Sequence, residues 1–325
     1  MIAHKKILVA GAGGFIGSHI ARTLFEQNNF VRAVDIKWDN YLSEPSCNEK
    51  LTLDLREQEN CRTATAGIDY VFNHAANMGG IGFITATGAD IMYDNVLINA
   101  HLARACVDNG VARLFFSSSA CVYPAYRQKT AQVTPLKEDD ANPADPDTFY
   151  GWEKLYTEKM LAAFRKDYSL DIRIARFHNI YGPEGTYDGG REKSPAALCR
   201  KVALAKNHES IEIWGDGNQT RSYCYITDCV EGVLRLMESG YVEPLNIGSD
   251  RLVTINEVAD IIISLSGKSI EKTYNNAAPQ GVRGRNCDNT LLRQTLRWEP
   301  RVSLEDGLAQ TYRWIESELR RKGAL

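Results

Sequence analysis

The chain has 325 residues, 44% of them hydrophobic and 24% charged, and its formal net charge is −3. This composition is ordinary for a folded protein, which excludes a disordered chain and a coiled coil, and the length provides one large or two modest domains. The sequence has no basic block and no apolar run as long as a membrane span, so nucleic acid and membranes are not expected partners.

The eight cysteines give no indication of a metal site, because no two of them have C-x-x-C spacing. The first apolar run is too short for the core of a signal peptide. We therefore expect a cytoplasmic protein that holds no metal and whose cysteines are reduced thiols.

The first predicted element is a buried strand over residues 7–10, which leads into a glycine-rich turn and then a helical pattern. Gly11, Gly14 and Gly17 permit, in turn, a tight bend, approach of the backbone to a pyrophosphate, and close packing of the helix on the strand. Free N–H groups where such a helix begins, at Phe15 and Ile16, bind phosphate. These features favour a dinucleotide site over the alternative, a strand–turn–helix without a ligand.

Acidic and small residues follow the next three predicted strands. Asp35 ends the strand over 31–34, where its carboxylate can accept hydrogen bonds from both ribose hydroxyls of NAD and would repel the 2′-phosphate of NADP. Asp54 follows a strand at 51–53 and could reach the adenine amino group. Ala75, after the strand at 70–72, leaves room for a cofactor to cross the loop. NAD is therefore the expected cofactor.

The remaining pattern to about residue 180 alternates strands with helices. We expect helices over 95–109 and 151–166, and strands over 114–116, which runs into three serines, and 172–175. Such alternation predicts an α/β fold with a doubly wound parallel Rossmann sheet, assigned to residues 1–180. Ligands of these sheets bind beyond the carboxyl ends of the strands.

After residue 180 the elements become short and mixed. A glycine-rich loop over 182–190 leads to a helix near Pro195, and short strands are expected at 211–214 and 223–226. Further helices are expected at 228–238, 255–265 and 303–320. This pattern predicts a smaller α/β lobe over 181–325 that supplies most substrate contacts, with chain crossovers between the lobes and a cleft between them.

Tyr150 and Lys154 have Y-x-x-x-K spacing, which places both on one side of a helix. A nearby ammonium favours phenolate, so we expect Lys154 to lower the pKa of Tyr150 and make it a base for an alcohol proton. The lysine could also hold the nicotinamide ribose. An exposed helix pair is the alternative, but the nucleotide-type fold before the motif favours catalysis.

Two candidates lie at the end of the strand over 114–116. Ser119 could hydrogen-bond the same substrate hydroxyl as Tyr150, although a turn serine satisfying the backbone is the alternative. Cys121 could become a thiolate base near a bound cofactor cation. On the residues alone, a small buried cysteine is the favoured interpretation.

Three cations complete the candidate site. Lys193, in a loop that contains two glycines, could donate a proton to a carbanion, although composition alone favours a solvated loop lysine. Arg283 and Arg285 suit a diphosphate because guanidinium binds phosphate oxygens as a fork, with ordinary surface arginines as the alternative.

Together these motifs resemble the nucleotide-sugar branch of the extended short-chain dehydrogenase/reductase family, over nearly the whole chain. Within that branch the sequence is most similar to the GDP-mannose 3,5-epimerase family. The specific matches are the stretches 76–84, 118–124, 176–183, 189–193, 214–222 and 281–286. It departs at Asn77, where we expect aspartate, and at Ile81, where we expect methionine, and it is shorter at both ends than the plant enzymes.

The resemblance implies that Cys121 and Lys193 are an acid/base pair. It implies a reaction on GDP-D-mannose in which NAD oxidises C4, C3 and C5 invert, and C4 is reduced again, giving GDP-L-galactose, or GDP-L-gulose after C5 inversion alone. It also implies a homodimer formed by the helices that begin near 95 and 151. The residues implied to touch the sugar nucleotide are Gly79, Ser119, Ala120, Cys121, Asn179, Glu192, Lys193, Lys201, Gly217, Asn218, Gln219 and Arg283.

Three alternatives stay open at this stage. A GDP-4-keto-6-deoxymannose epimerase-reductase resembles this chain, but it uses histidine opposite its cysteine and prefers NADPH, whereas Lys193 and Asp35 stand here. A 4,6-dehydratase would carry Asp-Glu where this chain has Ala120 and Cys121. A non-catalytic NAD-binding regulator would tend to lose Tyr150 or Lys154, and both are present.

Overall fold

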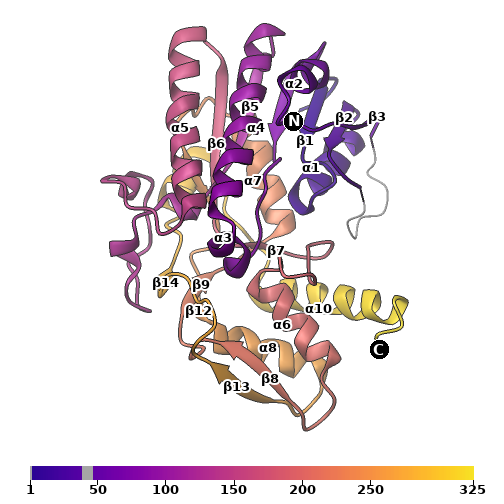
Figure 1. The fold of residues 1–325 in the computed structure, drawn as a ribbon, viewed down its shortest axis with the longest axis vertical. Coiled ribbons are helices and arrows are strands. Elements are labelled where there is room, and N and C mark those ends of the chain that lie inside the picture. The colour runs from indigo at the N-terminus through magenta and orange to yellow at the C-terminus, as the bar shows by residue number, and fades with distance from the viewer. Residues whose placement is uncertain (1, 39–46) are drawn as a thin grey trace.

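The computed structural model describes residues 2–38 and 47–325, and its centre is a seven-stranded sheet (Figure 1). The strand order is β11-β6-β5-β4-β1-β2-β3, and every neighbouring pair is parallel. The predicted doubly wound parallel sheet is therefore confirmed. The strands are β1 (Lys6–Ala10), β2 (Phe30–Asp35), β3 (Glu49–Thr52), β4 (Tyr70–Asn73), β5 (Arg113–Ser119), β6 (Asp171–Phe177) and β11 (Leu245–Ile247).

Helices cover both faces of this sheet, so its strands are apolar on both sides. In β1, Ile7 and Val9 belong to one buried cluster together with α1 (Phe15–Glu26) and α7 (Ile226–Glu238). Leu8 belongs to the other cluster, on the face of the remaining helices. These helices are α2 (Gln58–Thr65), α4 (Gly88–Asp108) and α5 (Phe149–Tyr168). Side chains that alternate along a strand thus contribute to two hydrophobic cores, one on each face of the sheet.

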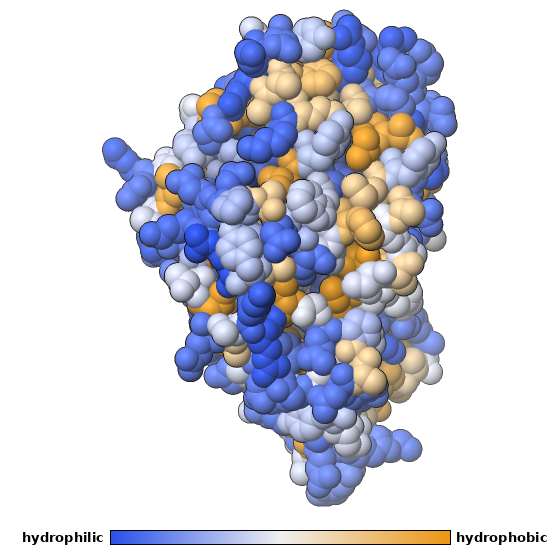
Figure 2. Space-filling model, turned by 60° about the vertical axis from the view of Figure 1, so that its left-hand side comes forward, coloured by the Kyte–Doolittle hydropathy of each residue, from blue (hydrophilic) through white to orange (hydrophobic). Residues whose placement is uncertain are grey.

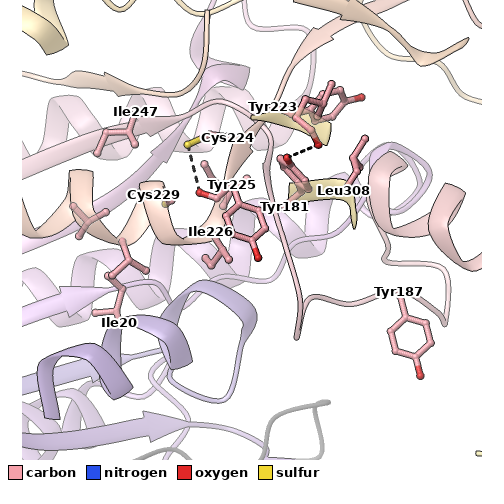
Figure 3. Packing of buried hydrophobic residues seen from close by; sticks show 14 of the residues in the cluster. Ile20, Tyr181, Tyr187, Tyr223, Cys224, Tyr225, Ile226, Cys229, Ile247 and Leu308 are labelled. Atoms are coloured by element: carbon pink, nitrogen blue, oxygen red, sulfur yellow. Dashed lines mark hydrogen bonds between the residues drawn. The ribbon is translucent and has the colours of Figure 1, made fainter. Parts of the chain in front are cut away.

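Most of the remaining elements are short strands and helices below the sheet in the view of Figure 1, whereas α9 (Thr290–Leu296) packs against β11 and α7. One buried cluster continues from α1 through α7 into this region, as the close contacts of Figure 3 show around Tyr225, Ile226 and Leu308. The elements are α3 (Ile81–Ala86), β7 (Ile180–Tyr181), α6 (Ser194–Leu204), β8 (Ser210–Trp214), β9 (Thr220–Ser222), β10 (Cys224–Tyr225), β12 (Leu252–Thr254), α8 (Ile255–Ser266), β13 (Glu271–Asn275), β14 (Gly284–Arg285), α9 (Thr290–Leu296) and α10 (Leu304–Arg321).

Some element boundaries differ from the expectations. The helix expected from about residue 95 begins at Gly88, and β5 extends through the three serines because these pair with β6 over Ala175–Phe177. The pattern did not predict α2, in which only three residues are buried, or the six-residue α3. Over the described ranges 2–38 and 47–325, none of the helices combines the length and apolar character of a membrane span.

Candidate active site

The glycine turn after β1 has the shape that dinucleotide binding requires. Gly11 has φ +79°, and a Cβ added to it would lie 2.6 Å from the backbone nitrogen of Ala75. A Cβ on Gly17 would lie 2.1 Å from the carbonyl oxygen of Gly11, so the predicted close packing of α1 is confirmed. Gly14 caps α1 without a side-chain hydrogen bond, which leaves the N–H groups at the start of the helix, from Phe15 and Ile16 onward, available for a diphosphate.

Asp35 lies beside this turn at the end of β2. Its Oδ2 accepts the N–H of Gly13 at 2.9 Å, and its Oδ1 accepts those of Ile36 at 2.7 Å and Lys37 at 3.3 Å. Burial raises the pKa of the carboxyl, while these backbone N–H groups oppose the rise. A carboxylate fixed by its own loop in this position fits a ribose, so the residues present fit a bound NAD.

Asp54 has a protein partner in addition to any cofactor contact. Its carboxylate binds Arg56 at 2.6 Å, and Arg56 also reaches Asp94 of α4 at 3.0 Å. The hydrogen bond from Arg56 holds the pKa of Asp54 below its ordinary value. The contact of Asp54 with adenine stays a prediction.

Ser119, Tyr150 and Lys154 come together where β5 ends and α5 begins. Tyr150 is buried, and the nearby Ser119 hydroxyl favours its phenolate form. The Lys154 Nζ atom lies 5.5 Å from the centre of the Tyr150 ring and 4.7 Å from that of Phe116. The expectation that Lys154 lowers the pKa of Tyr150 is wrong for this structure. Burial raises the pKa of Tyr150, and the charges of Cys121 and Glu153 raise it further, because an enclosed phenolate loses its hydration.

Cys121 lies in a short 3₁₀ turn directly after β5. The Ser119 hydroxyl accepts its N–H at 3.1 Å, which fixes the turn. A Cβ added to Gly151 of α5 would lie 2.1 Å from the Cys121 carbonyl oxygen, so only glycine lets the helix approach this closely. The small Ala120 between Ser119 and Cys121 is buried. The turn therefore presents the Cys121 side chain next to Tyr150.

Arg285 of β14 reaches Cys121 across the fold. Its Nη1 donates to the Cys121 sulfur at 3.2 Å, and its Nε donates to Gln128 at 2.5 Å. Asp147 lies 3.5 Å from the same guanidinium. Arg283, grouped with Arg285 in the sequence analysis, instead forms a two-pronged pair with Asp216 at 2.7 and 2.8 Å. The structure thus separates the two arginines.

Lys193 sits at the start of α6, after Gly189 and Gly190, which both have positive φ. Burial lowers the pKa of Lys193, and the charge of Cys121 acts in the opposite direction. Gly80 donates its N–H to the Arg191 carbonyl at 3.0 Å. A Cβ added to Gly80 would lie 2.3 Å from the carbonyl oxygen of Glu192, so the loop of Gly79 and the loop of Lys193 are in direct contact.

Several other predicted substrate residues gather near the turn after β8. Lys201 donates to the Glu212 carbonyl at 2.7 Å and lies 5.9 Å from the ring centre of Trp214. Gln219 donates to the Trp214 carbonyl at 2.6 Å, and its buried Oε1 has no hydrogen-bond partner among residues 2–38 and 47–325. Gly217, Asn218 and Arg283 contact Asp216 or lie next to it, whereas Asn179 donates to Ser222 at 2.9 Å, away from this turn.

The sequence analysis missed Gly151, Gln128, Asp147 and Arg221. Burial, together with the charge of Arg285, lowers the pKa of Arg221 to about 10. Arg221 of β9 is the strand partner of Arg285 of β14, so it adds a second guanidinium on the adjacent strand. The glycine that follows Tyr150 was the one available signal, because a glycine inside a helix needs a reason. The other three act through contacts between distant parts of the chain.

Comparison with known proteins identifies the family. The model of the NAD dependent epimerase/dehydratase family matches residues 7–248. The chain belongs to this family. It is 48% identical to GDP-mannose 3,5-epimerase 1 of Oryza sativa subsp. japonica over 98% of this chain and 83% of that protein. It is 47% identical to GDP-mannose 3,5-epimerase of Arabidopsis thaliana over 98% of this chain and 84% of that protein. The resemblance predicted from the motifs is confirmed.

More distant relatives share the architecture. GDP-L-fucose synthase of Escherichia coli is 28% identical over 99% of this chain and all of that protein. UDP-glucose 4-epimerase of Thermotoga maritima, solved with UDP-glucose, is 28% identical with a TM-score of 0.88, covering 98% of this chain and 100% of that one. MoeE5, solved with UDP-glucose and NAD, is 29% identical with a TM-score of 0.83, covering 97% and 99%.

Proposed function

We propose that this protein is an NAD-dependent nucleotide-sugar epimerase that converts GDP-D-mannose into GDP-L-galactose by inverting C3 and C5, with GDP-L-gulose as the product of C5 inversion alone. The observation that carries the proposal is the gathering of Cys121, Tyr150 and Arg285 beyond the carboxyl end of β5. There Cys121 packs against Tyr150, and Arg285 donates to the Cys121 sulfur at 3.2 Å. Near-half identity to proteins named GDP-mannose 3,5-epimerase supports the substrate.

The redox step uses the residues beside the glycine turn. When bound, NAD accepts a hydride from C4 of the sugar and later returns it. Asp35, Asp54, Ala75 and the glycine turn would hold the nucleotide, and Lys154 would hold its nicotinamide ribose. Tyr150, next to Ser119, takes the proton of the C4 hydroxyl and gives it back. To accept that proton Tyr150 must be a phenolate, and burial raises its pKa in this structure. The Lys154 ammonium and the positive charge that bound NAD would supply both favour the phenolate form.

The inversion needs one group that removes a proton and one that delivers it from the opposite face. Once C4 is a ketone, the protons on C3 and C5 become acidic. Cys121 and Lys193 serve as this pair, with Arg285 fixing the orientation of the sulfur. A lysine whose pKa is lowered by burial is a stronger acid than one in water, which suits proton delivery.

We place the substrate between Ser119 and the turn after β8. We assign the sugar to Gly79, Ser119, Ala120, Asn179 and Glu192. We assign the nucleotide to Lys201, Gly217, Asn218, Gln219 and Arg283, near the half-exposed Trp214 ring. The unpartnered Gln219 carbonyl oxygen offers an acceptor for a base N–H. In this division residues 1–180 mainly bind NAD and residues 181–325 mainly bind the sugar nucleotide.

The assembly we propose is a cytoplasmic homodimer that involves neither nucleic acid nor membrane. Four aromatic side chains on α4 and α5 are strongly exposed, although neighbouring residues of both helices are buried: Tyr93 67%, Phe149 62%, Trp152 42% and Tyr156 54%. Figure 2 views this side and shows pale and orange side chains among blue ones. Pairing of these helices with those of a second copy would cover the aromatic rings.

The closest alternative activity is that of a GDP-4-keto-6-deoxymannose epimerase-reductase, because the chain also resembles GDP-L-fucose synthase at 28% identity. Lys193 and Asp35 favour the epimerase. Purified protein incubated with NAD and GDP-mannose should give GDP-galactose and GDP-gulose by proton NMR without net NADH. Net consumption of NADPH with a 4-keto-6-deoxy substrate, and no change in GDP-mannose, would instead establish the reductase. Bound NAD with turnover of neither substrate would indicate an NAD-binding regulator.

A further inference from the structure

We propose that Glu153 is a positioning residue, a buried carboxylate that holds Lys154 and, through Asn95 and Asn77, aligns it with the loop that carries Lys193. The inference rests on the proposed function for its kinetic test. Glu153 lies on α5 between Tyr150 and Lys154, and none of its surface is exposed. A carboxylate is rarely buried without a partner of opposite charge, so its surroundings determine what it does.

Three side chains donate hydrogen bonds to Glu153, and one ammonium lies close to it. Asn99 Nδ2 donates to Oε1 at 2.8 Å, and the Thr157 hydroxyl donates to the same oxygen at 3.2 Å. Asn95 Nδ2 donates to Oε2 at 3.3 Å, and Lys154 Nζ lies 3.8 Å from that oxygen. Both carboxylate oxygens are thus hydrogen-bond acceptors with a cation next to them.

The orientations of the two amides are fixed by the backbone. Asn95 Oδ1 accepts the N–H of Asn77 at 2.6 Å, so its NH₂ group must point to Glu153. Asn99 Oδ1 accepts from Asn73 Nδ2 at 2.9 Å, and the Asn73 oxygen in turn accepts the N–H of Ala75 at 3.2 Å. Among these residues the Thr157 hydroxyl alone could accept a hydrogen from a protonated Glu153, and its oxygen already accepts from Asn99 Nδ2 at 3.3 Å. Burial raises the pKa of Glu153, whereas Lys154 and the hydrogen bonds from Thr157, Asn95 and Asn99 favour its ionised form.

Lys154 gains a fixed counter-charge from this arrangement. Burial lowers the pKa of Lys154, and Glu153 is the largest influence that opposes the shift, followed by Glu158 and Cys121. Glu158 is committed to Arg176 at 2.6 Å, whereas Glu153 has Lys154 as its cationic partner within the described part of the chain. The other titratable groups that face the ammonium are His74 and the Tyr150 ring.

The same carboxylate is linked to the loop of Lys193. Asn95, which donates to Glu153, also donates to the Asn77 carbonyl at 3.2 Å, so it holds the start of the loop over residues 77–80 on both sides. Asn77 Oδ1 accepts from Arg191 Nη1 at 3.2 Å, and Gly80 N–H donates to the Arg191 carbonyl. Movement at Glu153 is thus transmitted to the loop two residues before Lys193.

The test compares Glu153→Gln with a matched control, Thr157→Val, which removes one hydrogen bond to Glu153 but no charge. In Glu153→Gln the new side-chain amide must keep its oxygen toward Asn99 and Thr157, so its NH₂ group would face the Asn95 NH₂ group. We expect Glu153→Gln to lower kcat about tenfold or more with little change in KM, as for loss of an interaction that matters only in the transition state. The alkaline limb of kcat should move to lower pH by about one to three units, as for a lysine that loses a counter-charge within 4 to 6 Å. In Thr157→Val the alkaline limb of kcat should stay at the wild-type pH.

A second variant distinguishes the proposed role from loss of activity through misfolding. Asn95→Asp combined with Glu153→Gln returns a carboxylate to the same site and gives the NH₂ group of the introduced amide an acceptor, so the alkaline limb should return toward that of the wild type. Loss of activity in Glu153→Gln with an unmoved alkaline limb, and no return of the limb in the double variant, would overturn the proposal and leave a packing role.

If the wild type does not turn over GDP-mannose, the proposed function fails. In that case NAD affinity, measured by tryptophan fluorescence, tests whether Glu153 positions Lys154. Weaker binding at pH 9 than at pH 7 in Glu153→Gln, with no such difference in Thr157→Val, would support the proposal, and equal behaviour would refute it.

Discussion

The close approach of α5 to the Cys121 turn is the most direct structural requirement of the site, and Gly151→Ala tests it. The added methyl carbon would lie 2.1 Å from the Cys121 carbonyl oxygen and 2.9 Å from a Pro146 side-chain carbon. An ordinary carbon–oxygen contact is above 3 Å, so the helix and the turn must separate by about 1 Å. Because Tyr150 and Cys121 sit on opposite sides of this contact, the separation falls between the two proposed catalytic groups.

The two expected effects differ in size. Overpacking of this kind costs about 1 to 3 kcal/mol, while replacing a helical glycine with alanine returns up to about 1 kcal/mol, so the net loss of stability should be small. A misplacement of about 1 Å between reacting groups costs about 100-fold in rate. We therefore expect epimerisation of GDP-mannose to fall about 100-fold, whereas the thermal midpoint should fall by only a few degrees.

The assay is initial-rate NMR of product formation, with differential scanning calorimetry on the same samples. Gly240→Ala is the control, because a Cβ at Gly240 would have no atom within 4 Å. It should leave both rate and thermal midpoint unchanged. Full activity of Gly151→Ala would refute the idea that this approach sets the distance between Tyr150 and Cys121.

Three further predictions concern stability and assembly. Burial lowers the pKa of His74 to about 3, so the stability that its neutral form provides is present above pH 6.5 and is lost as the pH falls toward 3. Between pH 7 and 5, urea unfolding of His74→Phe should show about 2 kcal/mol less loss of stability than the wild type, and equal losses would contradict this. Arg176→Met should cost about 3 to 5 kcal/mol because Glu158 is left buried and unpaired, and Arg176→Met/Glu158→Leu should regain most of it unless the ion pair itself is the stabilising element. Trp152→Glu/Tyr156→Glu should elute as a monomer in size-exclusion chromatography with light scattering, and a persistent dimer would place the interface elsewhere.

Local patterns predicted the fold well. Local sequence predicted the strand–glycine–helix succession from β1 to α1 and the strand ends at Asp35 and Ser119, because each of these features depends on residues that are neighbours in sequence. The Cys121–Arg285 contact could not be predicted from local sequence, since 164 residues separate its partners. The pKa of Tyr150 was predicted in the wrong direction for a related reason. The spacing of Tyr150 and Lys154 indicates proximity, but it says nothing about how completely the rest of the chain encloses the phenol.

The buried network around Glu153 shows the same limit at shorter range. Glu153 precedes Lys154 directly, yet a glutamate inside a helical pattern is ordinarily taken for a solvent-facing residue. Its role depends on α4, whose asparagines Asn95 and Asn99 project toward it. Helix α2 was missed because its few buried residues provide little periodicity. Sequence patterns thus located the candidate site residues, while packing determined their charge states and partners.

The central claim, that Cys121 and Lys193 exchange protons at C3 and C5 of GDP-mannose, is tested most directly by an incubation in D₂O. Proton NMR and mass spectrometry should find deuterium at C3 and C5, together with GDP-galactose and GDP-gulose and no accumulated NADH. Cys121→Ser should lose this incorporation while still binding NAD. Wild-type protein that binds NAD and GDP-mannose but incorporates no deuterium at either carbon would contradict the account.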